Sequence, residues 1–363
     1  MAFQTITRHV DELLENENWF TLNRMIKADL IVLCQDRGLK TEGSKATLIQ
    51  SLMDWKLGAR PIPAPSTPQL EAQSVRQSSI YQSDYFDDLS DVVDEISFDS
   101  LEIGKKLGSG GFKDCYAGSY LGQPVAVGEL RITDFSAEDF VEIKHEISVL
   151  KQLRHENIVR FIGVSTNARR LCIITELCEH GDLFDYFRRT RRPGFAQMTM
   201  YMHDIALGVA YLHTRRPSVI HRDLKSMNIL ISGDNRAKIN DFGLARIRPR
   251  ANTMIHTQCG TPNWQAPEFW TVNPSYTEKV DVYACGLIYW EILQWGAEPF
   301  PYSDFTEHQL YIQVRDRNYR PSLAKLKRYP QTLLSLIQDM WAQDPAQRPS
   351  MSQVVERLLE YLC

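Results

Sequence analysis

The chain has 363 residues, of which 43% are hydrophobic and 24% are charged, and its formal net charge is −4 at pH 7. These values fit a soluble globular protein with one large domain and a small one, and they exclude a strong overall attraction to nucleic acid or anionic membranes. The seven cysteines are scattered without a C-x-x-C pair, which argues against a zinc site and favours a reducing compartment.

The first residues, MAFQTITRHVDELL, lack the charged-then-apolar pattern of a signal peptide. No run of about 18 apolar residues indicates a membrane span. We therefore expect an intracellular protein, either cytoplasmic or nuclear, without a membrane partner.

Residues 11–57 are predicted to form a small all-α module, a hairpin of two helices. Apolar residues recur at helical spacing on both sides of DRGLKTEG, whose glycines break the pattern. The periodic positions are Leu30, Leu33, Cys34, Leu48, Ile49 and Leu52.

Residues 58–96 have a different composition, rich in Pro, Ser and Gln and then acidic. Arg76 is the only basic residue among residues 61–100, against eight acidic ones. Such a segment buries little apolar surface, so we expect a flexible acidic linker. The remaining part, residues 97–363, begins with short strand patterns and continues with longer helical ones.

Three short motifs stand in this last part: HRDLKSMN at residues 221–228, DFG at 241–243 and APE at 266–268. Each is weak alone, but their order and spacing together resemble the protein-kinase catalytic domain. The resemblance runs over about residues 101–362, and in detail it is most similar to the tyrosine-kinase-like group of Ser/Thr kinases.

This resemblance implies an α+β fold with two lobes. The N-lobe would be an antiparallel five-stranded sheet plus one helix, the C-lobe would be mainly helical, and ATP would bind between them. Phosphoryl transfer requires a nucleophile placed in line and a neutralised phosphate charge, and it leaves little covalent chemistry to the protein.

Four residues of these motifs are predicted to carry the chemistry. Asp223 would accept or orient the proton of the substrate hydroxyl, and Lys225 would contact the transferring phosphate. Asn228 and Asp241 offer the oxygen ligands that Mg²⁺ prefers. Taken singly, Asp223 could be a loop cap and Asp241 a turn residue before Gly243. The joint pattern is what favours catalysis.

The resemblance also assigns an ATP site, a helix glutamate at Glu146 and two internal braces, Asp281 and an Arg348–Glu268 pair. Thr175 would be the gatekeeper beside the hinge. The predicted ATP-binding residues are Gly108, Ser109, Gly110, Gly111, Phe112, Lys113, Cys115, Ala126, Thr175, Glu176, Cys178 and Leu230.

The glycine-rich loop GSGGFKDCYAG departs from the family pattern G-x-G-x-x-G-x-V. Lys113 stands at the third glycine, and Gly128 stands where the third strand would carry a lysine. Residues two apart in a strand share a face, so Lys113 lies on the face of Cys115, and Gly128 on that of Ala126. Neighbouring strands are only about 4.8 Å apart, so a lysine stem at position 113 can reach the space above Gly128.

With-no-lysine kinases are similar at these two positions. By this resemblance, Lys113 would neutralise the α- and β-phosphates and pair with Glu146, and the chain would be a Mg-ATP-dependent Ser/Thr protein kinase. The alternative is a catalytically inactive pseudokinase that acts as a signalling or chromatin-associated scaffold. The family also suggests that Arg222 meets a phosphorylated activation segment, with Thr253 and Thr257 as candidate sites.

The module at residues 11–57 resembles a SAP domain, a small helical module often bound to DNA. The matching residues are Leu30, Leu33, Arg37, Gly38, Leu39, Gly43, Lys45 and Leu52. Backbone N–H groups and the Lys45 cation at the start of the second helix could meet a phosphate. Residues 1–60 have no net charge, which leaves a protein-interaction or dimerising hairpin as the alternative.

Overall fold

The computed structural model describes residues 34–35, 38–41, 47–48, 51–52, 95–109, 113–130, 147–167, 170–242, 246–248, 262–271 and 275–362. The chain divides into two units, residues 1–74 and 75–363, and each is described by itself.

The described residues of the first unit are helical at 34–35, 47–48 and 51–52. Cys34, Leu48 and Leu52 are all at most 1% exposed, and the Cys34 Sγ lies 3.8 Å from the Leu48 carbonyl oxygen. Gly38 has a φ of 66°. The N–H of Gly38 donates to Gln35 O, and that of Leu39 donates to Cys34 O, so Gly38 ends the first helix in a Schellman motif.

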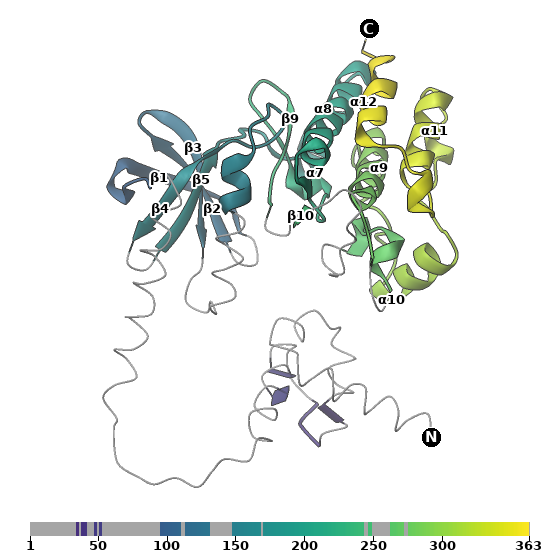
Figure 1. Cartoon of the computed structure of the whole chain (residues 1–363), viewed down its shortest axis with the longest axis horizontal. Coiled ribbons are helices and arrows are strands. Elements are labelled where there is room, and N and C mark those ends of the chain that lie inside the picture. Colours follow the sequence, from purple (N-terminus) through teal and green to yellow (C-terminus); the bar gives the residue numbers. More distant parts are fainter. Residues whose placement is uncertain are drawn as a thin grey trace. The chain divides into compact units, whose positions relative to one another are not determined.

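The second unit begins with a five-stranded antiparallel sheet in the order β1-β2-β3-β5-β4, as predicted (Figure 1). The strands are β1 (Leu101–Ser109), β2 (Lys113–Tyr120), β3 (Gln123–Leu130), β4 (Phe161–Asn167) and β5 (Arg170–Glu176). Leu121 and Gly122 join β2 to β3, both with positive φ, which is the backbone of the two-residue hairpin turn that matches strand twist.

The two faces of this sheet have different partners. Val125 and Val127 of β3 belong to a cluster with Ile96 and Leu101 on one face. Leu130, which alternates with them, joins the large core together with the helical residues 147–152. Gly128 therefore lies on the second face, as the alternation predicts.

The chain before the sheet is fixed to its edge. Glu95 forms a parallel bridge with Val164 of β4, and the Ile96 N–H donates to Val164 O at 2.7 Å. Ile96 is 5% exposed. This contact covers part of an edge strand that would otherwise present unpaired backbone groups.

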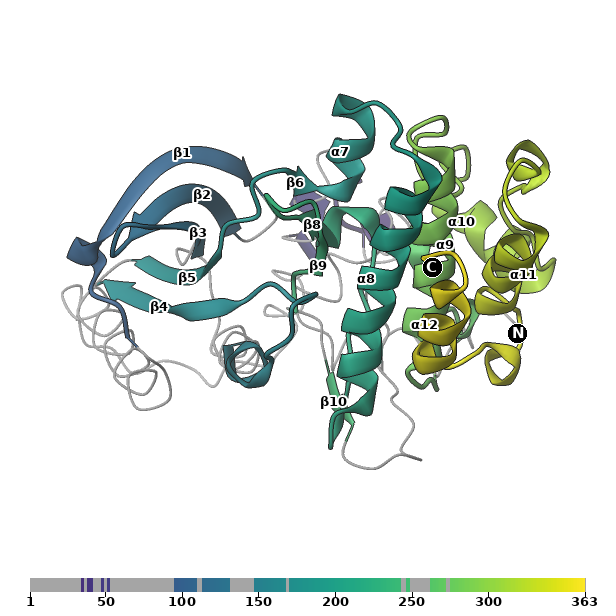
Figure 2. The same cartoon turned by 90° about the horizontal axis from the view of Figure 1, so that it is seen from above.

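The C-terminal lobe is mainly helical, as predicted, and lies on the other side of the hinge from the sheet (Figures 1 and 2). Its α-helices are α7 (Leu183–Arg189), α8 (Phe195–Thr214), α9 (Lys279–Gln294), α10 (Glu307–Leu310), α11 (Gln331–Met340) and α12 (Met351–Leu359). Short turns are η1 (Phe98–Ser100), η3 (Ser226–Asn228), η4 (Pro262–Trp264), η5 (Pro267–Phe269), η6 (Tyr311–Asp316, a π-helix), η7 (Ala324–Leu326) and η8 (Pro345–Gln347).

Small strands link this lobe to the cleft. The strands are β6 (Gly181–Asp182), β7 (Ser218–Ile220), β8 (Ile229–Ile231), β9 (Ala237–Ile239) and β10 (Arg246–Arg248). Strands β6, β8 and β9 form one sheet, and β7 pairs with β10. The catalytic motif thus lies between two strand pairs, because it connects β7 to β8.

Helix α9 is the centre of the lobe. Every residue from Val280 to Gln294 is buried, including the carboxylates Asp281 and Glu291. A charged group inside a protein requires a polar partner. The hydrogen bonds of these two side chains therefore identify the segments that α9 fixes.

The predicted brace between Arg348 and Glu268 is confirmed. The Arg348 side chain is 0% exposed, and its two terminal nitrogens donate to the two Glu268 oxygens at 2.6 and 2.8 Å. The same guanidinium donates to the carbonyls of Ala342 and Lys279. This pair ties the end of the APE motif to the turn before α12.

No helix in the described parts of the chain is long and apolar enough to span a bilayer.

Candidate active site

The catalytic loop is hydrogen-bonded to helix α9 through Asp281. The two Asp281 carboxylate oxygens accept hydrogen bonds from the backbone N–H groups of His221 and Arg222 at 2.8 and 2.9 Å, and one of them also contacts His213 Nε2 at 2.9 Å. Burial acts to raise the pKa of Asp281, but the His213 hydrogen bond and the nearby histidines outweigh it and lower the pKa below its usual value. Asp281 is therefore held ionised as the anchor of the loop.

The three polar side chains predicted on this loop are brought together. Lys225 Nζ donates to Asp223 Oδ2 at 2.7 Å. The Asn228 amide nitrogen donates to the Asp223 carbonyl at 2.8 Å and to its Oδ2 at 3.2 Å. The side chains of Asp223 and Lys225 are 11% and 19% exposed. This arrangement fixes the Asp223 carboxylate at the surface of the loop, where a hydroxyl can reach it.

The DFG motif begins in a left-handed backbone conformation, with a φ of 65° at Asp241. The Asn240 N–H donates to Asn228 O at 2.9 Å, so the two candidate metal ligands lie on directly bonded segments. Phe242 is 1% exposed and packs against the His221 ring at a centroid distance of 5.0 Å. His221 Nε2 contacts Asn240 O at 3.0 Å, so the His221 ring links the catalytic loop to the segment before Asp241.

The donor set fits Mg²⁺. The Asn228 amide nitrogen faces Asp223, so its Oδ1 is left on the side away from that bond. An amide oxygen and the Asp241 carboxylate are hard ligands that bind Mg²⁺ together with phosphate oxygens and water. Among the described residues, no group of three or more His, Cys, Asp and Glu side chains forms a metal site of another kind.

Lys113 occupies the space above Gly128. A Cβ built on Gly128 would lie 3.1 Å from Lys113 Cδ and 3.6 Å from Lys113 Cγ. Contacts near 3.1 Å are tighter than ordinary van der Waals packing, so the lysine stem passes directly over the glycine. As predicted, the Lys113 stem extends to the position where a side chain at residue 128 would begin.

The neighbours of Lys113 confirm the direction of its side chain. Lys106 and Asp114 pair at 3.0 Å, and Lys106 lies over the Tyr116 ring, so Asp114 and Tyr116 share one face of the sheet. Lys113 and Cys115 alternate with them and face the other side. Burial raises the pKa of the Cys115 thiol, and the positive charge of Lys113 partly offsets this rise.

The hinge after β5 is fixed by an ion pair to the C-terminal lobe. The Glu176 carboxylate accepts from Lys238 Nζ of β9 at 3.0 and 3.1 Å and from the Arg160 N–H at 2.7 Å. The Glu176 N–H donates to Arg160 O, and the Cys178 carbonyl accepts from Gly181 N–H.

Four other predicted ATP-binding residues lie on paired strands. Ala126 and Thr175 are directly paired in the β3–β5 ladder, and Gly108 is paired with Cys115. Leu230 lies in β8, opposite Asp182 and Lys238. Burial, together with the Glu176 charge, raises the pKa of the Cys178 thiol to about 12, so this hinge cysteine stays protonated.

Several predicted site residues lie outside the described parts of the chain. They are Gly110, Gly111 and Phe112 of the glycine-rich loop, Glu146 of the helix, and the candidate phosphosites Thr253 and Thr257. Arg222, predicted to meet a phosphorylated segment, is 6% exposed and donates to the Tyr276 hydroxyl at 3.1 Å.

Two residues of the site were missed by sequence reasoning. Lys238 was missed because its partner is 62 residues away in the chain. Ser226 stands inside HRDLKSMN, but its contact with Glu291 spans 65 residues and leaves no local signal.

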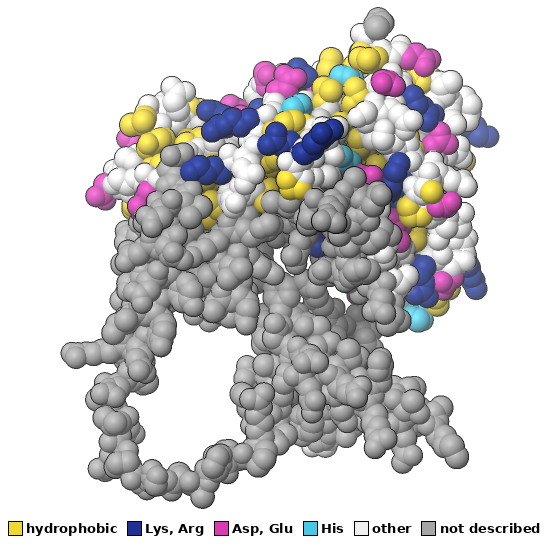
Figure 3. All heavy atoms as spheres, viewed as in Figure 1, with side chains coloured by type: hydrophobic (Ala, Val, Ile, Leu, Met, Phe, Trp, Pro, Cys, Tyr) yellow, Lys and Arg dark blue, Asp and Glu magenta, His cyan; other side chains and the backbone are white. Residues whose placement is uncertain are grey.

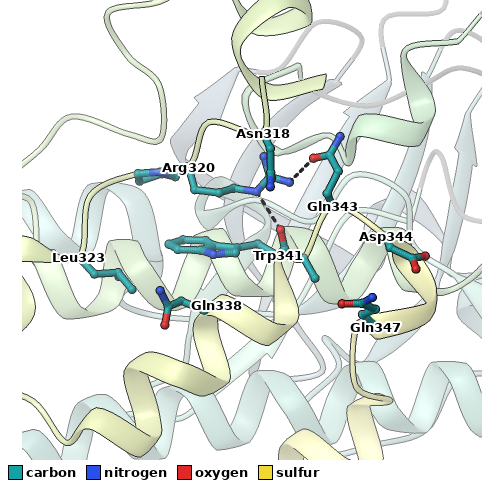
Figure 4. Close-up of a pocket in the computed structure, with 10 residues that line it drawn as sticks. Asn318, Arg320, Leu323, Gln338, Trp341, Gln343, Asp344 and Gln347 are labelled. Carbon is teal, nitrogen blue, oxygen red and sulfur yellow. Dashed lines mark hydrogen bonds between the residues drawn. The ribbon is translucent and has the colours of Figure 1, made fainter. Parts of the chain in front are cut away.

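A pocket of about 540 Å³ lies elsewhere in the C-terminal lobe, between residues 318–323 and 338–347 (Figure 4). Arg320 in this pocket donates to the Trp341 carbonyl at 2.8 Å and to Gln343 Oε1 at 2.7 Å, and it lies over the Tyr283 ring. The Arg320 guanidinium is therefore engaged by residues of the pocket wall, so the pocket is not interpreted as an anion-binding site. On the face shown in Figure 3, basic and acidic side chains of the described residues are interspersed.

A catalytic loop braced from a buried helix, below a hinge and a five-stranded sheet, defines the class of protein kinases. Residues 101–358 match the family described as protein tyrosine and serine/threonine kinase, and the chain belongs to this family. Residues 21–55 match the SAP domain, which confirms the predicted N-terminal module.

The curated relatives carry the same family name. The chain is 36% identical over 293 residues to a probable serine/threonine-protein kinase of Dictyostelium discoideum, covering 79% of this chain and 30% of that protein. It is 34% identical over 268 residues to a serine/threonine-protein kinase of Arabidopsis thaliana, covering 73% of this chain and 45% of that protein. The chain thus spans less than half the length of these relatives.

Proposed function

We propose that this protein transfers the terminal phosphoryl group of Mg-ATP to serine and threonine hydroxyls of proteins, with Lys113 in place of the lysine missing at Gly128. The observation that carries the proposal is the 3.1 Å between Lys113 Cδ and the Cβ position of Gly128. A chain that had abandoned nucleotide chemistry has no need to send a lysine into this space.

Each side chain then has one task. Asp223 orients the substrate hydroxyl and accepts its proton as the oxygen bonds to the terminal phosphorus, while ADP leaves on the opposite side. Lys225, bonded to Asp223 at 2.7 Å, neutralises charge on the transferring group. Asn228 and Asp241 would hold Mg²⁺, which when bound neutralises phosphate charge. Lys113 would hold the remaining phosphates.

Two features favour phosphoryl transfer to the hydroxyls of Ser and Thr. Lys225 follows Asp223 by two residues, as in the Ser/Thr members of the family that the sequence resembles. The curated relatives that match over most of the second unit are named serine/threonine-protein kinases. Glu146 is proposed as the carboxylate partner of Lys113.

The test is phosphate transfer by the purified full-length chain to itself and to a Ser/Thr substrate protein, compared with Lys113→Met and Asp223→Asn. We expect an active parent and a loss of about 100-fold or more in both variants, since Asp223→Asn removes the proton acceptor and Lys113→Met removes the cation proposed to hold the remaining phosphates. A matched control is Lys106→Met, which removes a lysine from the opposite face of the same hairpin and should leave the rate unchanged.

The outcomes separate the alternatives. Activity that survives Lys113→Met but not Asp223→Asn would mean a kinase with another phosphate clamp. A parent that binds Mg-ATP but transfers nothing, even after treatment with an upstream kinase, would mean a pseudokinase scaffold.

The SAP domain suggests a second partner, and we propose that it is duplex DNA. The predicted contacts are the positive side chains Arg37 and Lys45 with phosphate groups. Binding of the full chain should weaken as salt rises, and the Arg37→Glu/Lys45→Glu variant should lose both affinity and salt dependence. Salt-independent binding, or none, would favour a protein-interaction hairpin instead.

A further inference from the structure

Helix α9 carries a second buried carboxylate, Glu291, ten residues after the Asp281 anchor. Its residue is 4% exposed. Its Oε1 accepts a hydrogen bond from Ser226 Oγ at 2.7 Å, and its Oε2 accepts one from Trp264 Nε1 at 2.8 Å. One carboxyl group thus bonds two segments that are far apart in the chain.

Both segments belong to the proposed reaction. Ser226 stands in the catalytic loop, directly after Lys225 and two residues before Asn228. Trp264 ends the turn η4, two residues before the APE motif, in the stretch where the protein-kinase resemblance implies that the substrate hydroxyl docks. A small void is lined by Asp223, Trp264 and Asp281, so the catalytic loop, this stretch and α9 meet around one space.

We propose that Glu291 is a positioning residue that fixes the substrate-receiving stretch to the catalytic loop through Trp264 and Ser226. The inference deepens the proposed kinase function and rests on it. The catalytic loop and the stretch around Trp264 could each be well folded and still lie at the wrong separation. A shared hydrogen-bond acceptor sets that separation, and a misplacement of about 1 Å is enough to cost roughly 100-fold in rate.

The chemistry of the contact requires a side chain at position 291 that accepts a hydrogen bond from Trp264 and bonds to Ser226. An indole N–H can only donate, and a serine hydroxyl can donate or accept. Burial raises the pKa of Glu291 to about 8, partly offset by the hydrogen bonds from Ser226 and Trp264 and by the charge of Arg188 on α7. A glutamine has the same shape, accepts from Trp264 with its oxygen and donates to Ser226 with its nitrogen. It therefore preserves both contacts, whereas leucine removes both.

The turn η4 also makes a hydrogen bond that does not involve Glu291, and this bond provides a matched control. Asn263 Nδ2 donates to the Pro301 carbonyl at 2.9 Å, which holds the same turn to the loop after α9 but not to the catalytic loop. Asn263→Ala therefore weakens the turn without touching the connection to Ser226.

The first arm of the experiment measures kcat and KM for a Ser/Thr peptide and for ATP in the full-length protein. Glu291→Leu should lower kcat/KM for the peptide about 10-fold or more, while KM for ATP stays within twofold, and Glu291→Gln should restore the parent values. In the Glu291→Leu background, adding Ser226→Ala or Trp264→Phe should have no further effect on the peptide reaction, because each bond is already absent. Asn263→Ala should remain additive in that background.

The second arm does not depend on activity, so it separates failure of this inference from failure of the proposed function. Amide hydrogen exchange of the full chain is compared by mass spectrometry. Glu291→Leu should speed exchange in both 221–228 and 262–271, Glu291→Gln in neither, and Asn263→Ala only in the second. Exchange that rises in one segment alone, or equal effects of leucine and glutamine, would overturn the proposal even in a chain that transfers no phosphate.

Discussion

The bidentate pair between Arg348 and Glu268 gives a prediction in which the two partners should behave differently. Arg348 is 0% exposed and the Glu268 side chain is 14% exposed. Glu268→Ala leaves a buried guanidinium without its counter-charge, which costs about 3–5 kcal/mol. Arg348→Met leaves a carboxylate that can reach water and two carbonyls without their donor, so about 1–3 kcal/mol is expected.

Urea unfolding followed by tryptophan fluorescence measures both variants and the double variant. In a thermal melt of a domain of roughly this size, the 3–5 kcal/mol expected for Glu268→Ala corresponds to a fall of about 6–20 °C in the midpoint. The double variant should be less destabilised than the sum of the singles, because the uncompensated charge is gone. Equal costs for the two single variants, or strict additivity, would refute the argument that the buried charge dominates.

Three other predictions concern the strand glycine, the second α9 carboxylate and a second ion pair. Gly128→Ala should raise the thermal midpoint slightly, since a strand glycine costs about 0.5–1 kcal/mol against alanine, yet lower kcat because the new methyl would lie 3.1 Å from Lys113 Cδ; initial rates that match the parent would contradict the position of Lys113. The unfolding free energy should fall as pH rises from 4.5 to about 8, because burial raises the pKa of Glu291 to about 8 and this side chain ionises at lower pH in the unfolded chain. Urea titrations across this range should show a smaller fall for Glu291→Gln than for the parent. An equal pH dependence of the unfolding free energy in the two proteins would contradict the raised pKa. Asp204→Ala should cost only about 1–3 kcal/mol, since its partner Arg236 is 35% exposed and can turn to water; a loss above about 5 kcal/mol in thermal melts would mean that the guanidinium stays buried.

The parts of the site that follow from local geometry were predictable. Strand alternation has a period of two, so Lys113 and Cys115 had to share a face, and the structure places the lysine stem over Gly128. The helix stop at Gly38 follows equally from the left-handed backbone that glycine adopts without strain. Both predictions need only neighbours in the chain.

The parts that depend on tertiary packing were not predictable. The Glu176–Lys238 pair joins β5 to β9 across 62 residues, and Glu291 meets Ser226 across 65. Neither residue type carries a signal for such a partner, because exposed Glu and Lys are common at any surface.

The complete burial of α9 has a consequence for how the protein opens. Amide hydrogens from Val280 to Gln294 can exchange with solvent only through openings that approach global unfolding, so they should be among the most protected in the lobe. Asp281 and Glu291 lie on this slowest-opening helix, and the catalytic loop inherits its stability. A modification or partner that controls the proposed kinase activity therefore has to act on the segments that contact α9, because loosening the helix itself would unfold the lobe.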